Sequence, residues 1–375
     1  MTVVPEPETS PPSVEPAPRP APHRSPLRRW LRHHRAAAVW LCVVFAITQL
    51  LLAVYVDQEA PAVRDPEFYL LEGMLRDRMA EKPGRPTAMF LGSSRVAHGF
   101  DARRAAGEHD AVVFNFGVPG SGPFFQTVMM DRLAADGVRT DVLFLEVLHS
   151  FYNTAGVRSL DGSLLDGARL SYGEAVGLFD YTPKSQKGPL RRWALARALP
   201  VYRHQAELRD QIGLDIFRPG EGPTPPFAPI DPYGYRERPI DPEKRAMLTE
   251  LAHKQYDPFY TAFRFDPAAW NRLVGTIDRA RARGTDVVVV LMPEGSGFRN
   301  LYTPEVRAGV DGLVRRLRTE VGATVVDARE WLPDGAFYDQ HHLLPNGAKQ
   351  FADRFRTDAL EPALRRAEKR IAGER

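Results

Sequence analysis

Hydrophobic and polar positions alternate in two rhythms along most of this chain. From about Thr87 onward, short apolar runs are followed by longer segments in which apolar residues recur every three or four positions. The short runs are typical of buried strands, and the longer spacing is typical of helices that bury one face. Their alternation predicts an α/β domain with a mainly parallel, doubly wound sheet.

The predicted elements fall on both sides of one irregular region. Predicted strands are 88–91, 111–116, 142–147, 286–292 and 323–326, and predicted helices are 124–136, 267–283, 304–320 and 345–367. Residues 151–265 break this rhythm with Pro-rich stretches and a basic helical piece, PLRRWALARAL. We interpret this region as an insertion or lid on the sheet rather than an independent domain.

A third pattern lies near the N-terminus, where residues 36–56 carry no charge. As a helix this run would reach about 31 Å at roughly 1.5 Å per residue, which matches the bilayer core. The run therefore predicts one transmembrane helix. A buried core helix and a cleaved signal peptide are the alternatives, but the run is longer than a usual signal-peptide core and no clean cleavage site precedes Asp57.

The segments on either side of this helix differ in composition. Residues 1–35 combine many prolines with a cluster of arginines, which predicts a disordered and basic tail. Acidic residues follow the helix from Asp57 onward, so the positive-inside rule places the N-terminus in the cytoplasm and the rest outside it. We expect a single-pass plasma membrane protein with a juxtamembrane linker at 57–86 and the α/β domain at 87–375.

Charge and cysteine content narrow the function further. The net charge is +3, and the basic cluster directly precedes an apolar run, which favours membrane flanking over nucleic-acid binding. The single cysteine, Cys42, lies within that run. It excludes a disulfide within the chain and a metal site built from several thiolates, and we expect no cofactor.

Candidate chemistry begins where the first predicted strand continues into Gly92-Ser93-Ser94-Arg95. Open α/β sheets bind ligands at the carboxyl ends of their strands. A helix that starts after a small turn also points backbone N–H groups toward that edge. Ser94 is thus a candidate nucleophile, with simple helix capping by these serines as the alternative.

Two further segments complete a possible acyl-transfer site. Asp339 and His342 are three residues apart, so they can share one loop; Asp339 would fix the ring tautomer and His342 would take the Ser94 proton. The second predicted strand ends in a glycine-rich turn at 115–122, whose backbone N–H groups can face an oxyanion. Ordinary surface polarity and a tight turn are the alternatives for these two segments.

In order and context, these three segments resemble the SGNH/GDSL hydrolase superfamily. GSSR stands at the place of the family's Gly-Asp-Ser block, NFGVPG at its second block and DQHHL at its last. The resemblance implies a flavodoxin-like three-layer sandwich, with Ser94 as nucleophile, His342 as base and Asp339 as the acid that orients it. It also implies that Gly120 and the Ser94 N–H donate to the oxyanion.

Two departures from the family pattern bear on activity. Ser93 replaces the usual Asp of the first block, a variant that resembles envelope-facing relatives involved in alginate acetylation or teichoic-acid alanylation. The third block, normally Gly-x-Asn-Asp, reads LFLEVLHSFYN here, with no Asn at the expected place. Ser150 and Asn153 are the candidates for the missing oxyanion donor, whose loss lowers rates by about a hundredfold or more.

Other residues near these segments have less specific interpretations. We expect His341 to point away from the site, and His98 and His149 to be structural or surface residues, so no metal site is predicted. Glu146, in a buried strand, is either paired with a cation or tuned for function. Arg95 binds an anionic substrate group or, as is commoner for such a residue, lies on a helix surface.

The resemblance and the membrane helix together predict an extracytoplasmic serine esterase or O-acyltransferase. Its expected substrates are envelope polysaccharides or related acylated molecules, and a membrane-bound acyltransferase is a candidate partner. A non-catalytic accessory or binding protein built on the same fold is the alternative.

Overall fold

The computed structural model describes residues 34–154, 164–178, 189–212 and 229–373. Nearly all of the predicted N-terminal tail lies outside the described residues. The apolar run forms helix α2 (Arg35–Gln58), whose segment Ala37–Gln58 is long and apolar enough to cross a membrane. Only 11% of its most apolar window is buried, so it does not have the surroundings of a core helix. A single apolar helix in this position fits a signal anchor or a signal sequence.

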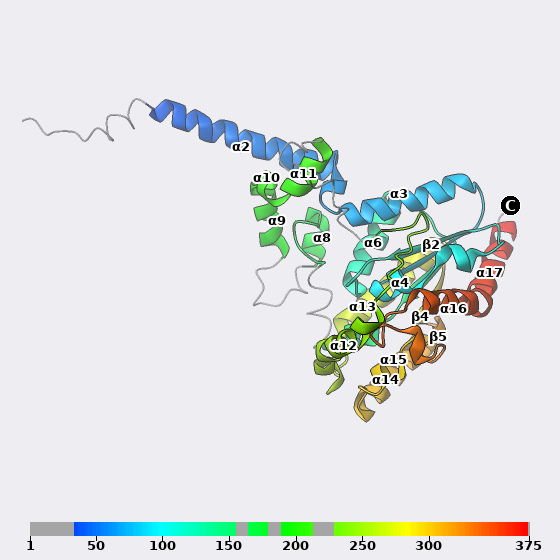
Figure 1. The fold of residues 1–375 in the computed structure, drawn as a ribbon. Coiled ribbons are helices and arrows are strands. Elements are labelled where there is room, and N and C mark those ends of the chain that lie inside the picture. The colour runs from blue at the N-terminus through cyan, green and yellow to red at the C-terminus, as the bar shows by residue number, and fades with distance from the viewer. Residues whose placement is uncertain (1–33, 155–163, 179–188, 213–228, 374–375) are drawn as a thin grey trace, which may run out of the picture. The chain divides into compact units, whose positions relative to one another are not determined.

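The chain divides into two compact units, Met1–Thr48 and Gln49–Arg375. The second unit contains a sheet of five parallel strands in the order β2-β1-β3-β4-β5 (Figure 1). The strands are β1 (Thr87–Gly92), β2 (Val112–Gly117), β3 (Val142–Glu146), β4 (Asp286–Leu291) and β5 (Thr324–Asp327). All five strands were predicted from the sequence to within about a residue at most ends, and the α/β fold class is confirmed. This strand order is a doubly wound one: β2 lies on one side of β1 and β3 to β5 on the other, so the direction in which strands are added to the sheet reverses at β1 and β3.

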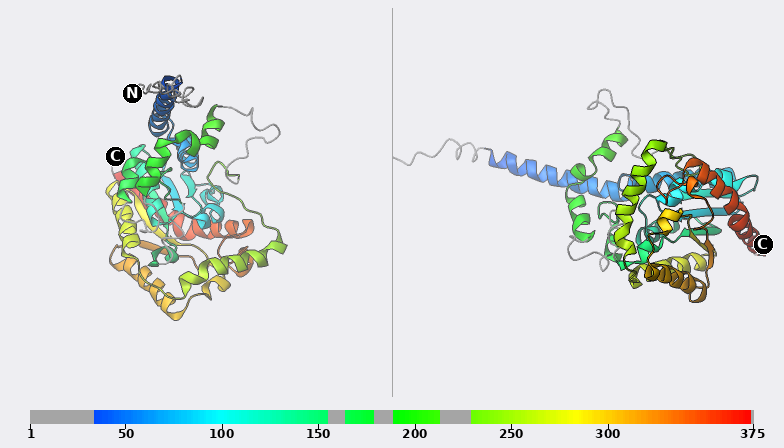
Figure 2. Two further views of the ribbon diagram at one scale, coloured as in Figure 1. Left: turned by 90° about the vertical axis from the view of Figure 1, so that its left-hand side faces the viewer. Right: turned by 60° about the horizontal axis from the view of Figure 1, so that its bottom comes forward.

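Helices cover both faces of the sheet (Figures 1 and 2), and successive residues of β1 belong to opposite cores. Met89 and Leu91 belong to one apolar core, whereas Ala88 and Phe90 belong to the other. The first core is covered by α3 (Pro66–Glu81), α6 (Pro123–Ala135), α13 (Pro267–Ala282) and α15 (Pro304–Thr319). The second is covered by α4 (Ser94–Gly99), α5 (Ala102–Ala106), α16 (Pro345–Phe355) and α17 (Glu361–Gly373), the last two joined by a π-helical turn at Arg356–Leu360. These layers make a three-layer sandwich, because a parallel sheet buries both faces.

Helix α3 corrects the expectation that residues 57–86 are only a linker. The short turn η1 (Pro61–Val63) precedes α3, whose Phe68, Leu71 and Leu75 are fully buried in the first core. Asp65 caps α3 and also receives a hydrogen bond from Arg132 of α6, at 2.7 Å. The helix therefore belongs to the α/β domain. Two glutamates, Glu67 and Glu72, are buried beside these three apolar residues, which obscured the apolar spacing in the sequence.

The interpretation of residues 151–265 as an insertion or lid remains a prediction. Its described part contains short helices and one longer helix, and none of its described residues belongs to a strand of the sheet. Asn153 and Phe265 form an isolated antiparallel bridge with each other, outside the sheet. The elements are η2 (His149–Tyr152), α8 (Tyr172–Gly177), α9 (Pro189–Ala198), α10 (Pro200–Arg203), α11 (Gln205–Ile212), η5 (Pro242–Lys244) and α12 (Arg245–Tyr260). Two short helices after this region, α14 (Ser296–Arg299) and η6 (Asp334–Ala336), flank the loops that follow β4 and β5.

Candidate active site

The turn after β1 brings a serine to the carboxyl edge of the sheet. Ser93 caps α4, and Ser94 is the first residue of that helix. Gly92 is required by close packing, since a Cβ there would lie 2.3 Å from Val96 Cγ2 and 2.6 Å from Glu146 Oε2. The strand thus runs into the helix without a loop, and this holds Ser94 at the edge where α/β sheets bind ligands.

Ser94, His342 and Asp339 form an unbroken hydrogen-bonded row. The Ser94 Oγ lies 2.7 Å from His342 Nε2, although the two residues are 248 positions apart. The His342 Nδ1 lies 2.7 Å from Asp339 Oδ2. A carboxylate accepts but does not donate, so Nδ1 carries the ring proton and Nε2 is left to accept from Ser94. The three residues have the order and spacing of a serine nucleophile, its base and the acid that orients the base.

Asp339 is held as a carboxylate by the residues that follow it. Its Oδ1 accepts the backbone N–H groups of His341, at 3.1 Å, and His342, at 2.7 Å. Burial alone would raise the pKa of Asp339, but the two histidines and the hydrogen bonds from His342 outweigh it and hold the pKa well below its usual value. Asp339 is therefore negatively charged when the His342 imidazole takes up a proton.

Two aromatic neighbours from its own loop pack against the His342 ring. Tyr338 stacks on it nearly parallel, with ring centroids 5.3 Å apart and 7° between the planes. The His341 ring lies 3.8 Å away, and it also stacks on Phe298 at 4.9 Å. The expectation that His341 points away from the site is therefore wrong, because Phe298 offers it a buried aromatic face beside His342. These contacts restrict the orientation of the base.

Beneath the row lies a buried group of ionisable side chains centred on Arg95. Its guanidinium donates to Glu294 Oε1 at 3.3 Å and to the carbonyl oxygens of Met292, at 2.9 Å, and Pro293, at 2.8 Å. Glu146 lies 3.9 Å from Arg95 Nε and accepts the backbone N–H of Ser93. Arg95 is only 2% exposed, so it lies neither on a helix surface nor open to an anionic substrate. Of the two interpretations of Glu146, pairing with a cation is therefore the one observed, and the cation is Arg95.

Two members of this group were missed from the sequence. Glu294 follows β4, and Tyr302 donates to its Oε2 at 2.6 Å. Burial raises the pKa of Glu146 and raises that of Tyr302 well above its usual value, so the phenol keeps its proton for Glu294. His149 packs edge-on against Tyr302, and burial lowers its pKa. A carboxylate two positions after the predicted strand 286–292 was the available signal for Glu294.

The glycine-rich turn is tied to the end of β1. The Val118 N–H and the Ser121 hydroxyl both donate to the Gly92 carbonyl oxygen, at 2.8 and 2.7 Å. Gly120, between them, has a φ of +82°, a backbone conformation that favours glycine. Asn115 anchors the start of the turn, since its amide donates to the carbonyl oxygens of Val96 and Phe100 in and after α4. The turn and the serine are thus parts of one edge.

The two candidates for the third oxyanion donor differ in their surroundings. The Asn153 amide donates at 2.8 Å to the carbonyl oxygens of both Phe259 and Ala262. Both of its hydrogens are therefore used to hold the last turn of α12 and the segment after it. Ser150 lies in η2, and its buried hydroxyl has no hydrogen-bond partner within the described residues. Of the two residues, Ser150 therefore has the hydroxyl that is available to donate to an oxyanion.

Metal ligation and hydrogen bonding compete for the same atoms here. Asp339, His341 and His342 each offer one ligand atom, and these atoms lie within 4.8 Å of one another. His342, however, uses both ring nitrogens, one toward Ser94 and one toward Asp339. The hydrogen-bonded row accounts for the placement of Asp339 and His342 without a metal ion.

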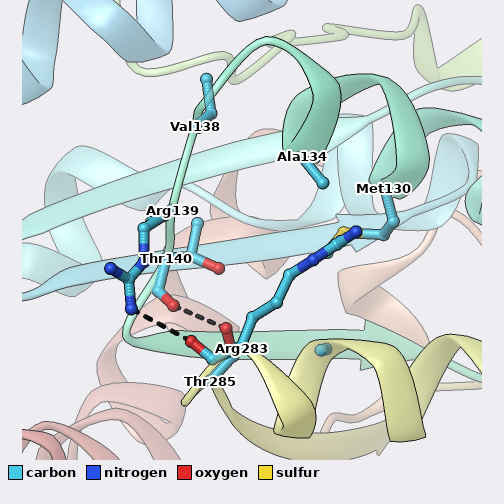
Figure 3. Close-up of a pocket in the computed structure, with 8 residues that line it drawn as sticks. Met130, Ala134, Val138, Arg139, Thr140, Arg283 and Thr285 are labelled. Carbon is cyan, nitrogen blue, oxygen red and sulfur yellow. Dashed lines mark hydrogen bonds between the residues drawn. The ribbon is translucent and has the colours of Figure 1, made fainter.

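A separate hollow lies at the opposite edge of the sheet, where β3 and β4 begin (Figure 3). Its lining residues are Met130, Ala134, Val138, Arg139, Thr140, Ala280, Arg283 and Thr285. The Thr285 hydroxyl donates to the Thr140 carbonyl at 2.8 Å, and Arg139 donates to the Arg283 carbonyl at 3.2 Å (Figure 3). Its polar groups bind one another, so we assign no chemistry to it.

Comparison with known proteins gives one match without an activity. Residues 38–186 match a family described as a protein of unknown function (DUF1574). The matched segment is less than half of the chain; it includes Ser94 and ends before Asp339 and His342. No curated protein matches the chain. The five-strand parallel sheet is compatible with an SGNH-like fold, and the function has to be inferred from the site.

Proposed function

We propose that this protein is a membrane-anchored, extracytoplasmic serine esterase or O-acyltransferase of the SGNH type. The observation that carries the proposal is the row Ser94–His342–Asp339, with both hydrogen bonds at 2.7 Å. A nucleophile, its base and an orienting acid in register at the carboxyl edge of a parallel sheet have the roles of an acyl-transfer triad.

In the first step, the Ser94 oxygen attacks the carbonyl carbon of an acyl ester while its proton passes to His342 Nε2. The carbonyl oxygen becomes an oxyanion, and Asp339 stabilises the imidazolium that forms. As the first residue of α4, Ser94 has a backbone N–H with no partner inside the helix. That N–H, the Gly120 N–H and the Ser150 hydroxyl are the oxyanion donors we propose.

In the second step, the ester C–O bond breaks and the departing alcohol takes the proton from His342. An acyl-Ser94 remains. Water or a sugar hydroxyl then gives its proton to His342 and attacks the acyl carbon. The bond between that carbon and the Ser94 Oγ breaks, the Oγ takes the proton back from His342, and an acid or a new ester is released. Water makes the protein an esterase, and a sugar hydroxyl makes it an O-acyltransferase.

The proposed substrates are acylated envelope polysaccharides or related molecules, with a membrane-bound acyltransferase as a candidate source of the acyl group. The Ser93 variant of the first block, shared with envelope-facing relatives, supports this class. Anchoring through α2 supports it too, because tethering confines a catalyst near wall polymers and raises its effective concentration there. In this proposal the N-terminus is cytoplasmic and the α/β domain lies outside.

The test is hydrolysis of a chromogenic acetyl ester by the detergent-solubilised full-length protein. We expect Ser94→Ala to lower kcat by about 10³-fold or more with an unchanged melting temperature. Ser93→Ala is the matched control, since it removes the neighbouring cap hydroxyl and leaves the nucleophile. An acyl adduct on the peptide that carries Ser94, seen by mass spectrometry, would identify a transferase with slow hydrolysis. Equal activity in the wild type and Ser94→Ala would refute the serine mechanism.

One observation favours a non-catalytic accessory protein as the second candidate. The third block lacks its usual Asn, and the amide of Asn153 is consumed by two backbone carbonyls. Such a protein would bind its polymer equally well as wild type and as Ser94→Ala, and would form no acyl adduct with any acetyl donor.

A further inference from the structure

The helices α9, α10 and α11 pack against the last turns of α2. Arg197 of α9 donates through its Nε to Asp57 at 3.0 Å, and Leu208 of α11 is buried with Val56 and Val63. The backbone N–H of Val201 in α10 makes a long hydrogen bond of 3.5 Å to the Gln49 side chain. These contacts all lie within the unit that begins at Gln49.

The contact at Gln49 fixes the height of α10 along α2. Gln49 precedes Asp57 by eight residues, which is about 12 Å along a helix at roughly 1.5 Å per residue. Asp57 is the first charged residue after the apolar run. If α2 spans a bilayer, α10 is therefore level with the outer part of the apolar core and not with the water above it. Gln49 is itself buried, which accounts for a polar residue in that run.

Apolar side chains are exposed on α10, level with Gln49, and on α9, whose Arg197 reaches Asp57 at the end of the apolar run. Leu195 is 55% exposed, Leu199 43%, Val201 47% and Tyr202 77%. Such a patch is unfavourable in water, whereas aliphatic side chains favour acyl chains and tyrosine favours the membrane interface. Arg203 of α10 is also exposed and pairs with Asp166. Its long side chain can reach the headgroups while the apolar groups lie deeper.

We propose that α9–α11 form an interfacial collar, residues 189–212, whose exposed apolar side chains insert into the outer leaflet of the bilayer that α2 crosses. The proposal rests on the membrane anchoring in the proposed function, and it does not depend on catalysis. The packing of the collar on α2 selects lipid as the occupant, because α10 lies level with the apolar run of α2 and α9 lies at the end of that run.

The collar is linked to the α/β domain through α8. Tyr172 of α8 contacts Trp193 of α9 with ring centroids 5.2 Å apart. Glu174 of α8 accepts from Arg132 of α6 at 2.8 Å, and Arg132 also binds Asp65. Insertion of the collar would thus add a second attachment of the α/β domain to the membrane beside the helix itself.

The test measures the depth of single spin labels in the full-length protein, reconstituted in vesicles of phosphatidylethanolamine and phosphatidylglycerol. Cys42→Ala removes the only cysteine, and Tyr202→Cys, Leu50→Cys and Met247→Cys then carry one label each. Leu50 is an exposed residue of α2, and Met247 is an exposed apolar residue of α12, whose Tyr256 and Tyr260 pack on the α/β core. We expect the ratio of oxygen to nickel-chelate accessibility at Tyr202 to exceed that at Met247 several-fold, with a shallower position than Leu50.

Each other result has a separate meaning. A label at Tyr202 that behaves like Met247, with Leu50 in lipid, overturns the collar and leaves the anchor intact. Labels in water at all three positions overturn the anchor and the collar together. A label at Tyr202 that is immobile and reached by neither reagent means that a second copy or another protein covers the patch, which also overturns the proposal.

Discussion

Ser94 and Arg95 are neighbours in α4, yet their side chains have opposite surroundings. Ser94 is partly exposed at the sheet edge, where its hydroxyl meets His342. Arg95 turns inward and is 2% exposed, among Glu146, Glu294 and backbone carbonyls. In the serine row, the hydrogen bonds are arranged for transfer of a proton from Ser94 to His342. In the group around Arg95, the charges are buried and paired with one another.

This difference assigns the two residues different roles: Ser94 acts in the proposed reaction, and Arg95 stabilises the structure around it. Removing the Ser94 hydroxyl leaves no buried charge behind, so it can abolish activity without loosening the fold. Removing the Arg95 guanidinium leaves two buried carboxylates without their cation, and one of them, Glu146, also holds the Ser93 N–H beside the nucleophile. Substitution of Ser94 should therefore lower activity, whereas substitution of Arg95 should lower the stability of the fold.

The largest expected effect on stability follows from Arg95→Met. Breaking a buried ion pair from one side destabilises a protein by about 3–5 kcal/mol, since the remaining charge is uncompensated. Chemical denaturation monitored by circular dichroism measures this change in the free energy of unfolding. Arg104→Met is the matched control: Arg104 pairs with Asp353 on the surface, and such pairs contribute about 1 kcal/mol or less. Equal effects of the two substitutions would contradict the supporting role of Arg95.

The sequence predicted more of the fold than of this support. Apolar runs located all five strands because burial on both faces leaves little room for polar residues. Ser94, His342 and Asp339 could be selected because their residue types and order carry a known chemistry. The sequence did not reveal that Arg95 turns inward or that His341 stacks beside His342, because rotamers and long-range partners such as Glu294 and Phe298 decide both. Helix α3 was missed for a related reason, since its buried positions include the charged residues Glu67 and Glu72.

A second, smaller effect concerns His98, which lies beside the row with its ring centroid 6.2 Å from that of His342. Its Nδ1 lies 3.0 Å from the Arg236 carbonyl oxygen. Burial lowers the pKa of His98 to about 4, and the charges of His342, Arg238 and Arg236 also oppose its protonation. The unfolded chain therefore binds this proton more readily than the folded one.

Stability from His98 is thus present above pH 6.5 and is lost as the pH falls from about 6.5 to 4. The shift corresponds to about 3 kcal/mol over that window. We expect His98→Asn, whose amide can still donate to Arg236, to be less stable at pH 7.5 but to lose less stability on acidification. Urea denaturation at several pH values measures both. His109→Asn, at a partly exposed histidine, is the control substitution. If the free energy of unfolding of His98→Asn ran parallel to that of the wild type between pH 6.5 and 4, His98 would not be the source of the pH dependence.

The smallest expected effect tests how the row is held in place. Tyr338 stacks on His342, and the Arg238 guanidinium lies over the same tyrosine ring at 5.5 Å. Aromatic pairs contribute about 0.5–1.5 kcal/mol, so Tyr338→Leu should lower kcat for ester hydrolysis by about 2–10-fold by freeing the imidazole. Tyr338→Phe keeps the ring and should retain nearly full activity. KM should change little in either variant, because the ring positions the base and is not proposed to contact substrate. If Tyr338→Phe and Tyr338→Leu lower kcat equally, the tyrosine hydroxyl rather than the stacked ring supports His342.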